Sequence, residues 1–201
     1  MYPIKGTTIL GLTCKDGIVI AGDMQVTQYM SGYVAHKLVK KVNKLADNII
    51  GGFAGLVADA QTLFETVRAR IKLLELDEKR QIKVKIAANI LSSILFNMRR
   101  YPFYLEALIG GIDDDGTHLF SLDMVGSILE EKFLALGPGA TIAYGLLEER
   151  YDDNITINYG IKLATESLIS AYRRNSLTGN VLQIMSLRED GGLSESITTI
   201  T

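Results

Sequence analysis

Residues 6–23 read Gly6-Thr-Thr-Ile-Leu-Gly-Leu-Thr-Cys-Lys-Asp-Gly-Ile-Val-Ile-Ala-Gly-Asp23, two apolar runs divided by Lys15-Asp16-Gly17. The first run alternates in part between apolar and small or polar residues, as a strand with one buried face does. Asp-Gly accepts the positive φ angles of a tight turn, so the division predicts a hairpin. The fold is therefore expected to begin with two antiparallel strands.

Strands and helices alternate in blocks along the rest of the chain. The pattern predicts strands over 41–45 and 48–54, amphipathic helices from Val57 to Leu74 and from Ala87 to Met98, strands over 105–112, 118–122 and 128–136, helices over 142–150 and 157–171, and strands over 181–187 and 193–200. Hairpin-joined strands favour antiparallel sheets, and two helix pairs need two apolar faces to cover. The expected fold class is α+β, a four-layer αββα sandwich of two largely antiparallel sheets between helix pairs.

Composition limits the function classes. The 201 residues, 47% of them hydrophobic, suit one domain, and a net charge of -2 with 22% charged residues argues against nucleic-acid binding. Cys14 is the only cysteine, which excludes an internal disulfide and favours the cytoplasm. No segment has the length of a signal peptide's apolar core or of a membrane span, so we expect neither export nor insertion into a membrane.

Metal ligands are scarce in the sequence. His36 and His118 with one cysteine make a poor inventory for zinc, which usually takes three or four clustered ligands. The run Asp113-Asp-Asp-Gly116 lacks the alternating spacing of a calcium loop, so we interpret it as a solvated turn without a function. No metal site is expected.

Thr7 stands where the first strand begins, and the six residues before it have the length of a leader. The predicted organisation is a leader over 1–6 and a single domain over 7–201. A threonine hydroxyl is a weak nucleophile at neutral pH. Cleavage between Gly6 and Thr7 would create an α-amine with a pKa of about 7.7–8.0, which can accept the hydroxyl proton. Nucleophile and general base would then belong to one residue.

Three other residues supply what such a nucleophile needs. Asp23 ends the second strand, Lys41 begins the third, and Gly55 lies where a strand turns into a helix. A lysine favours the deprotonated hydroxyl, a carboxylate orients the lysine, and a backbone N–H can stabilise an oxyanion. Taken singly, these residues are explained more simply as a turn residue, a solvated lysine and a packing glycine.

Taken together, the motifs resemble the β subunit of the proteasome, of archaeal type. The residues that carry the resemblance are Gly6-Thr-Thr-Ile-Leu-Gly11, Ile20-Ala-Gly-Asp23, Val26-Thr27, Lys40-Lys41, Gly52-Phe-Ala-Gly55, Asp59-Ala60, Leu108-Ile-Gly-Gly-Ile112, Leu136-Gly-Pro-Gly139 and Tyr144-Gly145. Their spacings agree as well as their identities, over essentially the whole chain. The resemblance implies the N-terminal-nucleophile hydrolase fold.

It also implies a threonine-type endopeptidase that removes its own leader. Such a subunit degrades unfolded proteins without a cofactor, inside stacked seven-membered rings of α subunits and other β subunits, served by a regulatory ATPase. The implied catalytic residues are Thr7 as nucleophile, Lys41 to lower the hydroxyl pKa, Asp23 to pair with Lys41, and Gly55 as oxyanion donor. The implied substrate-binding residues are Thr27 and Val57 for the peptide backbone, with Val26 and Phe53 lining the pocket for the residue before the cut.

Two supporting positions depart from the active pattern. Asn175-Ser-Leu-Thr-Gly179 stands where active subunits carry Asp-Ser-x-Ser-Gly, and Gly137-Pro-Gly-Ala140 stands where they carry Gly-Ser-Gly-Ser. A lost charge-assisted hydrogen bond is worth about 1.5–3 kcal/mol, on the order of ten- to a hundredfold in rate. Pro138 has neither hydroxyl nor N–H, whereas Ser176 and Thr178 keep hydroxyls. We therefore expect impaired activity or activity that depends on partner subunits.

Three alternatives stay open. The chain could be a structural β subunit that keeps its leader while another β chain cuts peptides. Residues 6–65 also resemble the peptidase of the bacterial two-ring ATP-dependent protease, through Ala21-Gly-Asp23, Val39-Lys-Lys-Val42 and Thr62-Leu-Phe-Glu65, although that peptidase lacks the stretch after Tyr101. A binding protein of another class would have these motifs by coincidence.

Overall fold

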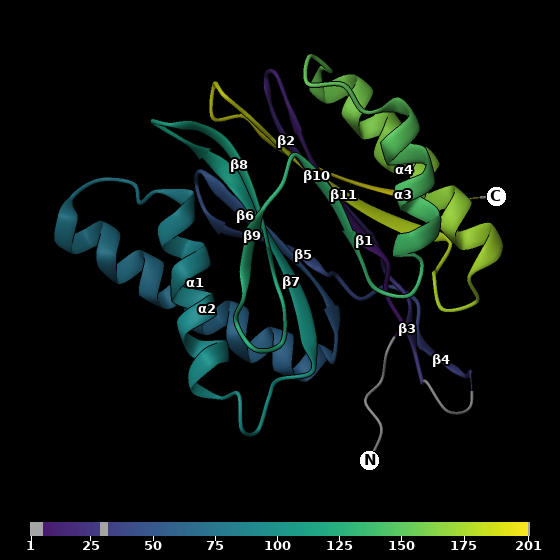
Figure 1. Cartoon of the computed structure of the whole chain (residues 1–201), viewed down its shortest axis with the longest axis horizontal. Coiled ribbons are helices and arrows are strands. Elements are labelled where there is room, and N and C mark those ends of the chain that lie inside the picture. Colours follow the sequence, from purple (N-terminus) through teal and green to yellow (C-terminus); the bar gives the residue numbers. More distant parts are fainter. Residues whose placement is uncertain (1–5, 29–31, 201) are drawn as a thin grey trace.

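The computed structural model describes residues 6–28 and 32–200. The predicted leader, residues 1–6, therefore lies outside the described residues except for Gly6. In the described part, two sheets form the middle layers and a pair of helices covers the outer face of each sheet (Figure 1). This arrangement confirms the predicted α+β class and the four-layer αββα sandwich.

The first sheet has the strand order β10-β1-β2-β11-β12, and α3 and α4 cover it. Neighbouring strands in it are antiparallel. Its elements are β1 (Ile9–Cys14), β2 (Gly17–Asp23), β10 (Phe133–Leu136), α3 (Ala140–Arg150), α4 (Ile157–Arg174), β11 (Val181–Arg188) and β12 (Leu193–Thr199).

The second sheet has the order β5-β6-β7-β8-β9, also antiparallel, and α1 and α2 cover it. Its elements are β5 (Val42–Ala46), β6 (Ile49–Gly55), α1 (Val57–Glu78), α2 (Val84–Asn97), β7 (Leu105–Asp113), β8 (Gly116–Leu122) and β9 (Ile128–Glu130). A two-stranded ribbon of β3 (Val26–Thr27) and β4 (Val34–His36), which the sequence did not predict, lies beside the start of β1 (Figure 1).

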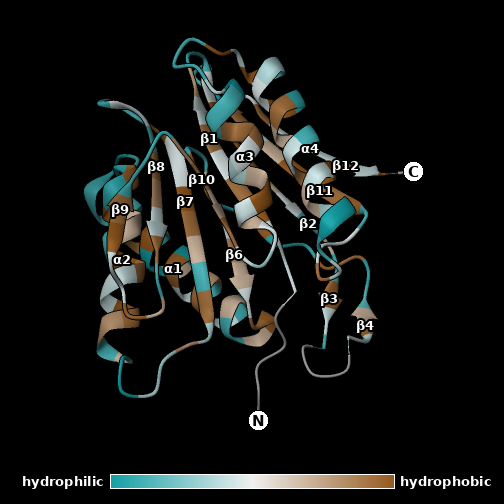
Figure 2. Cartoon of the chain, turned by 45° about the vertical axis from the view of Figure 1, so that its right-hand side comes forward, coloured by the Kyte–Doolittle hydropathy of each residue, from teal (hydrophilic) through white to brown (hydrophobic). Residues whose placement is uncertain are grey.

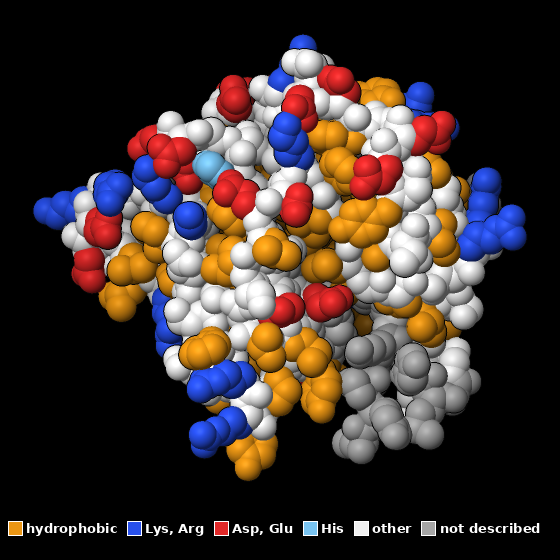
Figure 3. Space-filling model, in the orientation of Figure 1, with side chains coloured by type: hydrophobic (Ala, Val, Ile, Leu, Met, Phe, Trp, Pro, Cys, Tyr) orange, Lys and Arg blue, Asp and Glu red, His pale blue; other side chains and the backbone are white. Residues whose placement is uncertain are grey.

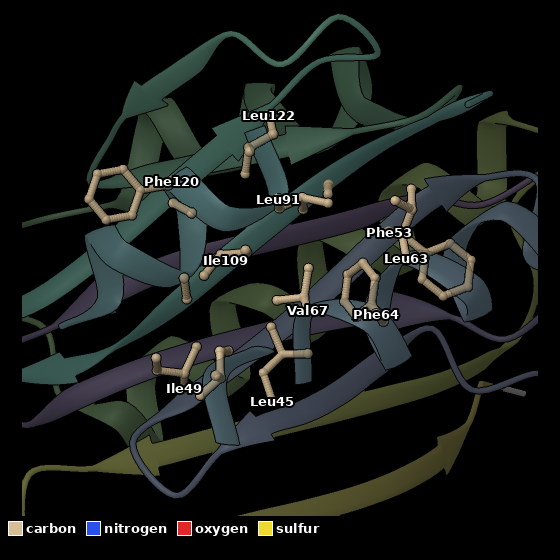
Figure 4. Close-up of a cluster of buried hydrophobic side chains, with 14 of the residues drawn as sticks. Leu45, Ile49, Phe53, Leu63, Phe64, Val67, Leu91, Ile109, Phe120 and Leu122 are labelled. Carbon is tan, nitrogen blue, oxygen red and sulfur yellow. The ribbon is translucent and has the colours of Figure 1, made fainter. Parts of the chain in front are cut away.

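Apolar side chains fill three interfaces between the four layers. Ile9, Ile20 and Ile50 belong to the cluster between the two sheets, which are brown along much of their length in Figure 2. Figure 4 shows the cluster between the second sheet and its helices, where Phe53 of β6 meets Phe64 of α1 edge to face at 5.7 Å between ring centroids. Among residues 6–28 and 32–200, no helix is long and apolar enough to cross a membrane.

The predicted first hairpin is confirmed. β1 and β2 pair from Ile9 opposite Gly22 to Cys14 opposite Gly17. Gly17 has a φ of 146°, and a Cβ there would clash with the carbonyl oxygen of Leu187. Only glycine fits this turn without strain. The hairpin register brings the end of β2 back beside the start of β1, where Thr7 lies.

The single strand predicted over 128–136 is wrong. It divides into β9, which pairs with β8 in the second sheet, and β10, which pairs with β1 in the first. Glu130 at the end of β9 and the two connecting residues, Glu131 and Lys132, are exposed. Three consecutive charged side chains favour solvent over burial, so the chain passes between the sheets at this point.

The acidic turn at 113–116 has a structural role that the sequence did not suggest. The Asp113 carboxylate accepts a 2.8 Å hydrogen bond from the Val84 N–H at the start of α2. Asp115 pairs with Lys83 at 2.6 Å. Carboxylates stabilise helix N-termini, where N–H groups lack intrahelical partners. The turn therefore fixes the beginning of α2, contrary to the interpretation that it has no function.

Candidate active site

Thr7 lies just before β1 and is buried, with 1% of its surface exposed. Its hydroxyl donates a hydrogen bond to the carbonyl oxygen of Gly6. Both residues line a cavity of about 290 Å³, whose wall also includes Ala54, Gly55, Tyr104, Leu105, Glu106, Met124, Gly137, Pro138 and Leu177. The predicted nucleophile therefore stands directly at the predicted cleavage bond, beside a space into which a ligand could enter.

Asp23 and Lys41 form a buried ion pair next to that bond. Their side chains are 0% and 1% exposed, and Lys41 Nζ lies 3.3 Å from Asp23 Oδ1. The other carboxylate oxygen, Oδ2, accepts the Thr8 N–H at 2.6 Å. Lys41 Nζ also donates to the Gly6 carbonyl oxygen at 3.2 Å and to the Gln25 carbonyl oxygen. The structure thus joins Lys41 to both the predicted carboxylate partner and the predicted cleavage site.

Burial lowers the pKa of the Lys41 ammonium from its ordinary value of 10.5, because a charge is costly away from water, while the Asp23 carboxylate opposes this shift. The effect of burial is the larger of the two, so the pKa of Lys41 is lowered overall. A lysine with a lowered pKa gives up its proton more readily than an exposed lysine does. Burial of both side chains distinguishes this pair from an ion pair on the surface.

Two glycines line the cavity at Thr7 in positions where a side chain would clash with the backbone. Gly55 ends β6 with a φ of 148°, and a Cβ there would clash with the carbonyl oxygen of Tyr104. Gly137 has a φ of 88°, and its Cβ would clash with the carbonyl oxygen of Thr7 itself. The first was predicted as the oxyanion donor and lines the cavity at Thr7. The second was quoted only as part of a motif, and its close approach to Thr7 became visible in three dimensions.

The two divergent segments are tied together by hydrogen bonds. The Asn175 amide donates to the Pro138 carbonyl oxygen at 2.8 Å, and its side-chain oxygen accepts the Leu177 N–H at 2.8 Å. The hydroxyls of Thr178 and Thr8 lie 2.8 Å apart, and the latter accepts from the Gly139 N–H at 3.0 Å. Asparagine therefore uses its N–H₂ group here, which an aspartate could not replace.

Ser176 takes a smaller part than the sequence suggested. It is exposed, and its carbonyl oxygen accepts a 3.4 Å hydrogen bond from the Gln25 amide. Thr8, which was not predicted as a site residue, instead supplies the buried hydroxyl that joins the two segments. Its signal in the sequence was only the doubled threonine after Gly6.

The four predicted substrate-binding residues lie in different places. Thr27 is fully buried and lies beside Gly6, since a Cβ on Gly6 would be 2.9 Å from the Thr27 Cβ. Phe53 lines a different cavity of about 390 Å³ between the segment before β5 and α1. Val26 is buried in the β3–β4 ribbon, and Val57 packs at the start of α1 against the outer core. Their roles in substrate binding stay predictions.

A larger cavity, about 970 Å³, lies elsewhere, between β8, β9, β10 and α3. Its lining includes Thr13, Glu131 and Tyr144, and none of the residues that surround the Gly6–Thr7 bond. Figure 3 shows acidic, basic and apolar side chains interspersed on the visible face of the described residues. Size alone does not identify a site, and the converging nucleophile and ion pair favour the smaller cavity.

Comparison with known proteins identifies the family of the chain. The sequence model of the family described as "Proteasome subunit" matches residues 4–187. "Proteasome subunit beta" of Archaeoglobus profundus is 38% identical over 188 residues, 93% of this chain and 86% of that protein. The protein of the same name from Methanothermobacter thermautotrophicus is 35% identical over 189 residues, 94% and 89% of the two chains. "Proteasome subunit beta 2" of Thermofilum pendens is 35% identical over 196 residues, 98% and 95%.

These matches extend over nearly the whole fold rather than over one motif. They include the hairpin that carries Thr7 and Asp23, the segment that carries Lys41, and the glycine at the end of β6. The chain therefore belongs to the proteasome subunit family, and the relatives that it resembles are β subunits of archaea.

Proposed function

We propose that the chain is a threonine-type endopeptidase subunit of a proteasome core particle, with Thr7 as its nucleophile. The observation that supports this most directly is the meeting of the Thr7 hydroxyl with the Gly6 carbonyl group, beside the buried Lys41–Asp23 pair. The proposed organisation remains a leader over 1–6 and a peptidase domain over 7–201.

The first step that we propose is cleavage of the Gly6–Thr7 bond by the chain itself. Thr7 Oγ adds to the Gly6 carbonyl carbon, the C–N bond breaks, and the hydroxyl proton passes to the departing Thr7 nitrogen. The leader is then held as an ester and Thr7 carries a free amine. Water then hydrolyses the ester and frees the leader carboxylate. Lys41 Nζ, 3.2 Å from the Gly6 oxygen, is placed to stabilise the negative charge that forms on it.

Cleavage changes what Thr7 can do. With Gly6 attached, its nitrogen is an amide and cannot act as a base. The freed amine can take the hydroxyl proton of Thr7 as Oγ attacks a substrate carbonyl, and can return it to the departing amine. Water completes the cycle by hydrolysing the acyl ester. In this proposal Lys41 lowers the hydroxyl pKa, Asp23 orients Lys41, and the Gly55 N–H faces the oxyanion.

Substrate binding and assembly are part of the same proposal. Thr27 and Val57 would bind an unfolded peptide as an added strand, and Val26 and Phe53 would line the pocket before the cut. Family membership supports assembly with α subunits and other β subunits in stacked seven-membered rings, served by a regulatory ATPase in the cytoplasm.

A second candidate is a structural β subunit that retains its leader. The observation that favours it is the neutral amide of Asn175 bonded to the carbonyl of Pro138, where active subunits would place a carboxylate and a serine. In this arrangement residues 137–139 and 175–178 are joined by hydrogen bonds without a carboxylate at position 175. The subunit would then fill ring positions while another β chain performs hydrolysis.

Peptidase activity of the complete particle separates the two candidates. Thr7→Ala removes the nucleophile, and Thr62→Ala removes an exposed helical hydroxyl that bonds only within its own helix. We expect the first change to abolish the activity contributed by this subunit and the second to leave it intact. Equal activity in the two variant particles would support a structural subunit and contradict the proposal that this chain is an endopeptidase subunit.

A further inference from the structure

Lys41 and Asp23 reach each other from different sheets. Asp23 is the last residue of β2 in the first sheet, whereas Lys41 directly precedes β5 in the second. Their ion pair therefore depends on how the two sheets are held together at this end of the sandwich. Apolar packing alone tolerates small sliding movements, so a directional contact between the sheets is needed to fix the position of an ammonium group.

Gln183 makes that contact. It lies in the apolar strand β11, is 1% exposed, and reaches across to the backbone where β5 begins. Its side-chain oxygen accepts the N–H groups of Lys41 at 2.9 Å and Val42 at 3.0 Å. Its side-chain N–H₂ donates to the Val42 carbonyl oxygen at 2.8 Å. One amide thus pairs with three backbone groups at the residue that carries the ammonium and its neighbour.

The same strand holds the other half of the ion pair. β11 pairs with β2 in a register that sets Gln183 opposite Gly22 and Leu182 opposite Asp23. The backbone of β11 therefore fixes the backbone of Asp23. The Gln183 side chain fixes the backbone of Lys41. A third restraint comes from the second sheet, where the Phe53 N–H donates to the Lys41 carbonyl oxygen at 3.2 Å.

The Gln183 amide is itself held from the outside. Its second N–H bond goes to Glu195 Oε1 of β12 at 2.8 Å, and the same oxygen lies 2.8 Å from Lys40 Nζ. Hydrogen bonds from Lys40 and Gln183 lower the pKa of the Glu195 carboxyl, so it stays ionised. The network continues from a surface ion pair, through one buried amide, to the backbone of Lys41.

We infer that Gln183 is a positioning residue for the reaction, which sets the place of Lys41 relative to Asp23 and the Gly6–Thr7 bond. The inference rests on the proposed peptidase function. Gln183 touches no reacting atom, so it acts through the lysine. A displacement of about 1 Å in a catalytic group can lower a rate on the order of a hundredfold.

A merely structural amide would behave differently. Asn48 provides the comparison, because it is also a buried amide that donates to two backbone carbonyls, those of Ile82 and Ile112. It lies in the turn between β5 and β6, at the opposite end of β5 from Lys41. Loss of either amide should loosen the sandwich, but only loss of Gln183 should move the ammonium.

The kinetic experiment compares complete particles that carry Gln183→Met, Asn48→Leu or neither change. For Gln183→Met we expect kcat to fall on the order of ten- to a hundredfold with KM changed by less than about twofold, and for Asn48→Leu we expect both constants to stay near those of the unchanged particle. Equal kinetic constants in the two variants would overturn the inference.

A pair of substitutions tests the network if Gln183→Met fails to fold. Gln183→Glu places a second carboxylate against Glu195 and should lower kcat strongly. Adding Glu195→Gln restores a donor and acceptor pair between the two positions, and should recover at least part of the lost kcat. A double variant that is no better than Gln183→Glu alone would contradict the inference.

A readout without peptidase activity keeps the two proposals apart. In the full chain carrying Thr7→Ala, the titration of Lys41 can be followed by nuclear magnetic resonance of lysine labelled at Cε, with assignment by loss of the signal in Lys41→Met. Gln183→Met should let water reach the ammonium and raise its pKa toward the ordinary value, while Asn48→Leu should not. If the pKa of Lys41 is the same with and without Gln183→Met, the inference is overturned even if the particle is an active peptidase. If the pKa rises in Gln183→Met but the particle without substitutions has no peptidase activity, the result counts against the proposed peptidase function alone.

Discussion

Removing Lys41 should separate the stability of the site from its chemistry. Lys41→Met keeps the length of the side chain but leaves the Asp23 carboxylate, which is 0% exposed, without its ammonium partner. Loss of one member of a buried pair costs about 3–5 kcal/mol. At about 2–4 °C for each kcal/mol in a chain of this size, the melting temperature should fall by roughly 6–20 °C.

The double variant Lys41→Met/Asp23→Asn is the informative comparison. Asparagine is neutral, and its one side-chain oxygen can accept only one of the two N–H groups, of Thr8 and Gln25, that the two Asp23 oxygens accept now. We expect the double variant to recover part of the lost stability, because the uncompensated charge is gone, but to recover no cleavage of the Gly6–Thr7 bond.

Calorimetry of the full chain measures the first quantity, and mass spectrometry after assembly measures the second. Asp23→Asn alone serves as the control that keeps the lysine without its carboxylate. If the double variant cleaves its leader as fast as the unchanged chain, the Lys41–Asp23 pair is structural and the proposed chemistry is wrong. If it is no more stable than Lys41→Met, the cost of the unpaired carboxylate has been misjudged.

Three further outcomes are expected. Because the pKa of Lys41 is lowered in the folded state, the unfolded chain binds more protons, and the free energy of unfolding should rise with pH up to about 10.5. Denaturant titrations from pH 7 upward should show a smaller rise of this free energy with pH in Lys41→Met. Asn175→Asp should not increase peptidase activity, because a carboxylate oxygen would replace the N–H₂ donor 2.8 Å from the Pro138 carbonyl oxygen; a faster particle would refute this. Gly137→Ala should abolish peptide hydrolysis by the subunit, because the added methyl group would clash with the Thr7 carbonyl oxygen. Gly145→Ala has open space around the added methyl group and should leave peptide hydrolysis unchanged in the same assay.

Local signals were sufficient where a residue's role follows from its neighbours in the chain. The Asp-Gly turn and its apolar flanks predicted the hairpin, and the hairpin alone brings Asp23 back beside Thr8, with a 3.1 Å hydrogen bond between its N–H and the Thr8 carbonyl oxygen. The helix spacing after Val57 likewise predicted α1. The periodicity of one element is enough for such inferences.

Contacts between distant segments could not be predicted in the same way. Gln183 stands between the apolar residues Leu182 and Ile184, and nothing near it in sequence indicates that it pairs with the backbone at Lys41, 142 positions away. The division of residues 128–136 between two sheets also depends on tertiary pairing. In both cases a long-range interaction overrides the local pattern.

The divergent segments illustrate a third limit. The sequence indicated that Asn175 lacks a charge and that Pro138 lacks a hydroxyl. It did not indicate that the first donates to the carbonyl of the second, nor that Thr8 and Thr178 supply the adjacent hydroxyls. The prediction of impaired or partner-dependent activity stays a prediction, and the structure adds that hydrogen bonds join the two segments.

The mass of this chain in a particle that contains all its subunits tests the central claim most directly. Hydrolysis between Gly6 and Thr7 should shorten the chain by its first six residues and leave a free amine on Thr7, while Thr7→Ala should keep them. A complete, active particle in which this chain still carries residues 1–6 would contradict the claim that Thr7 is its nucleophile.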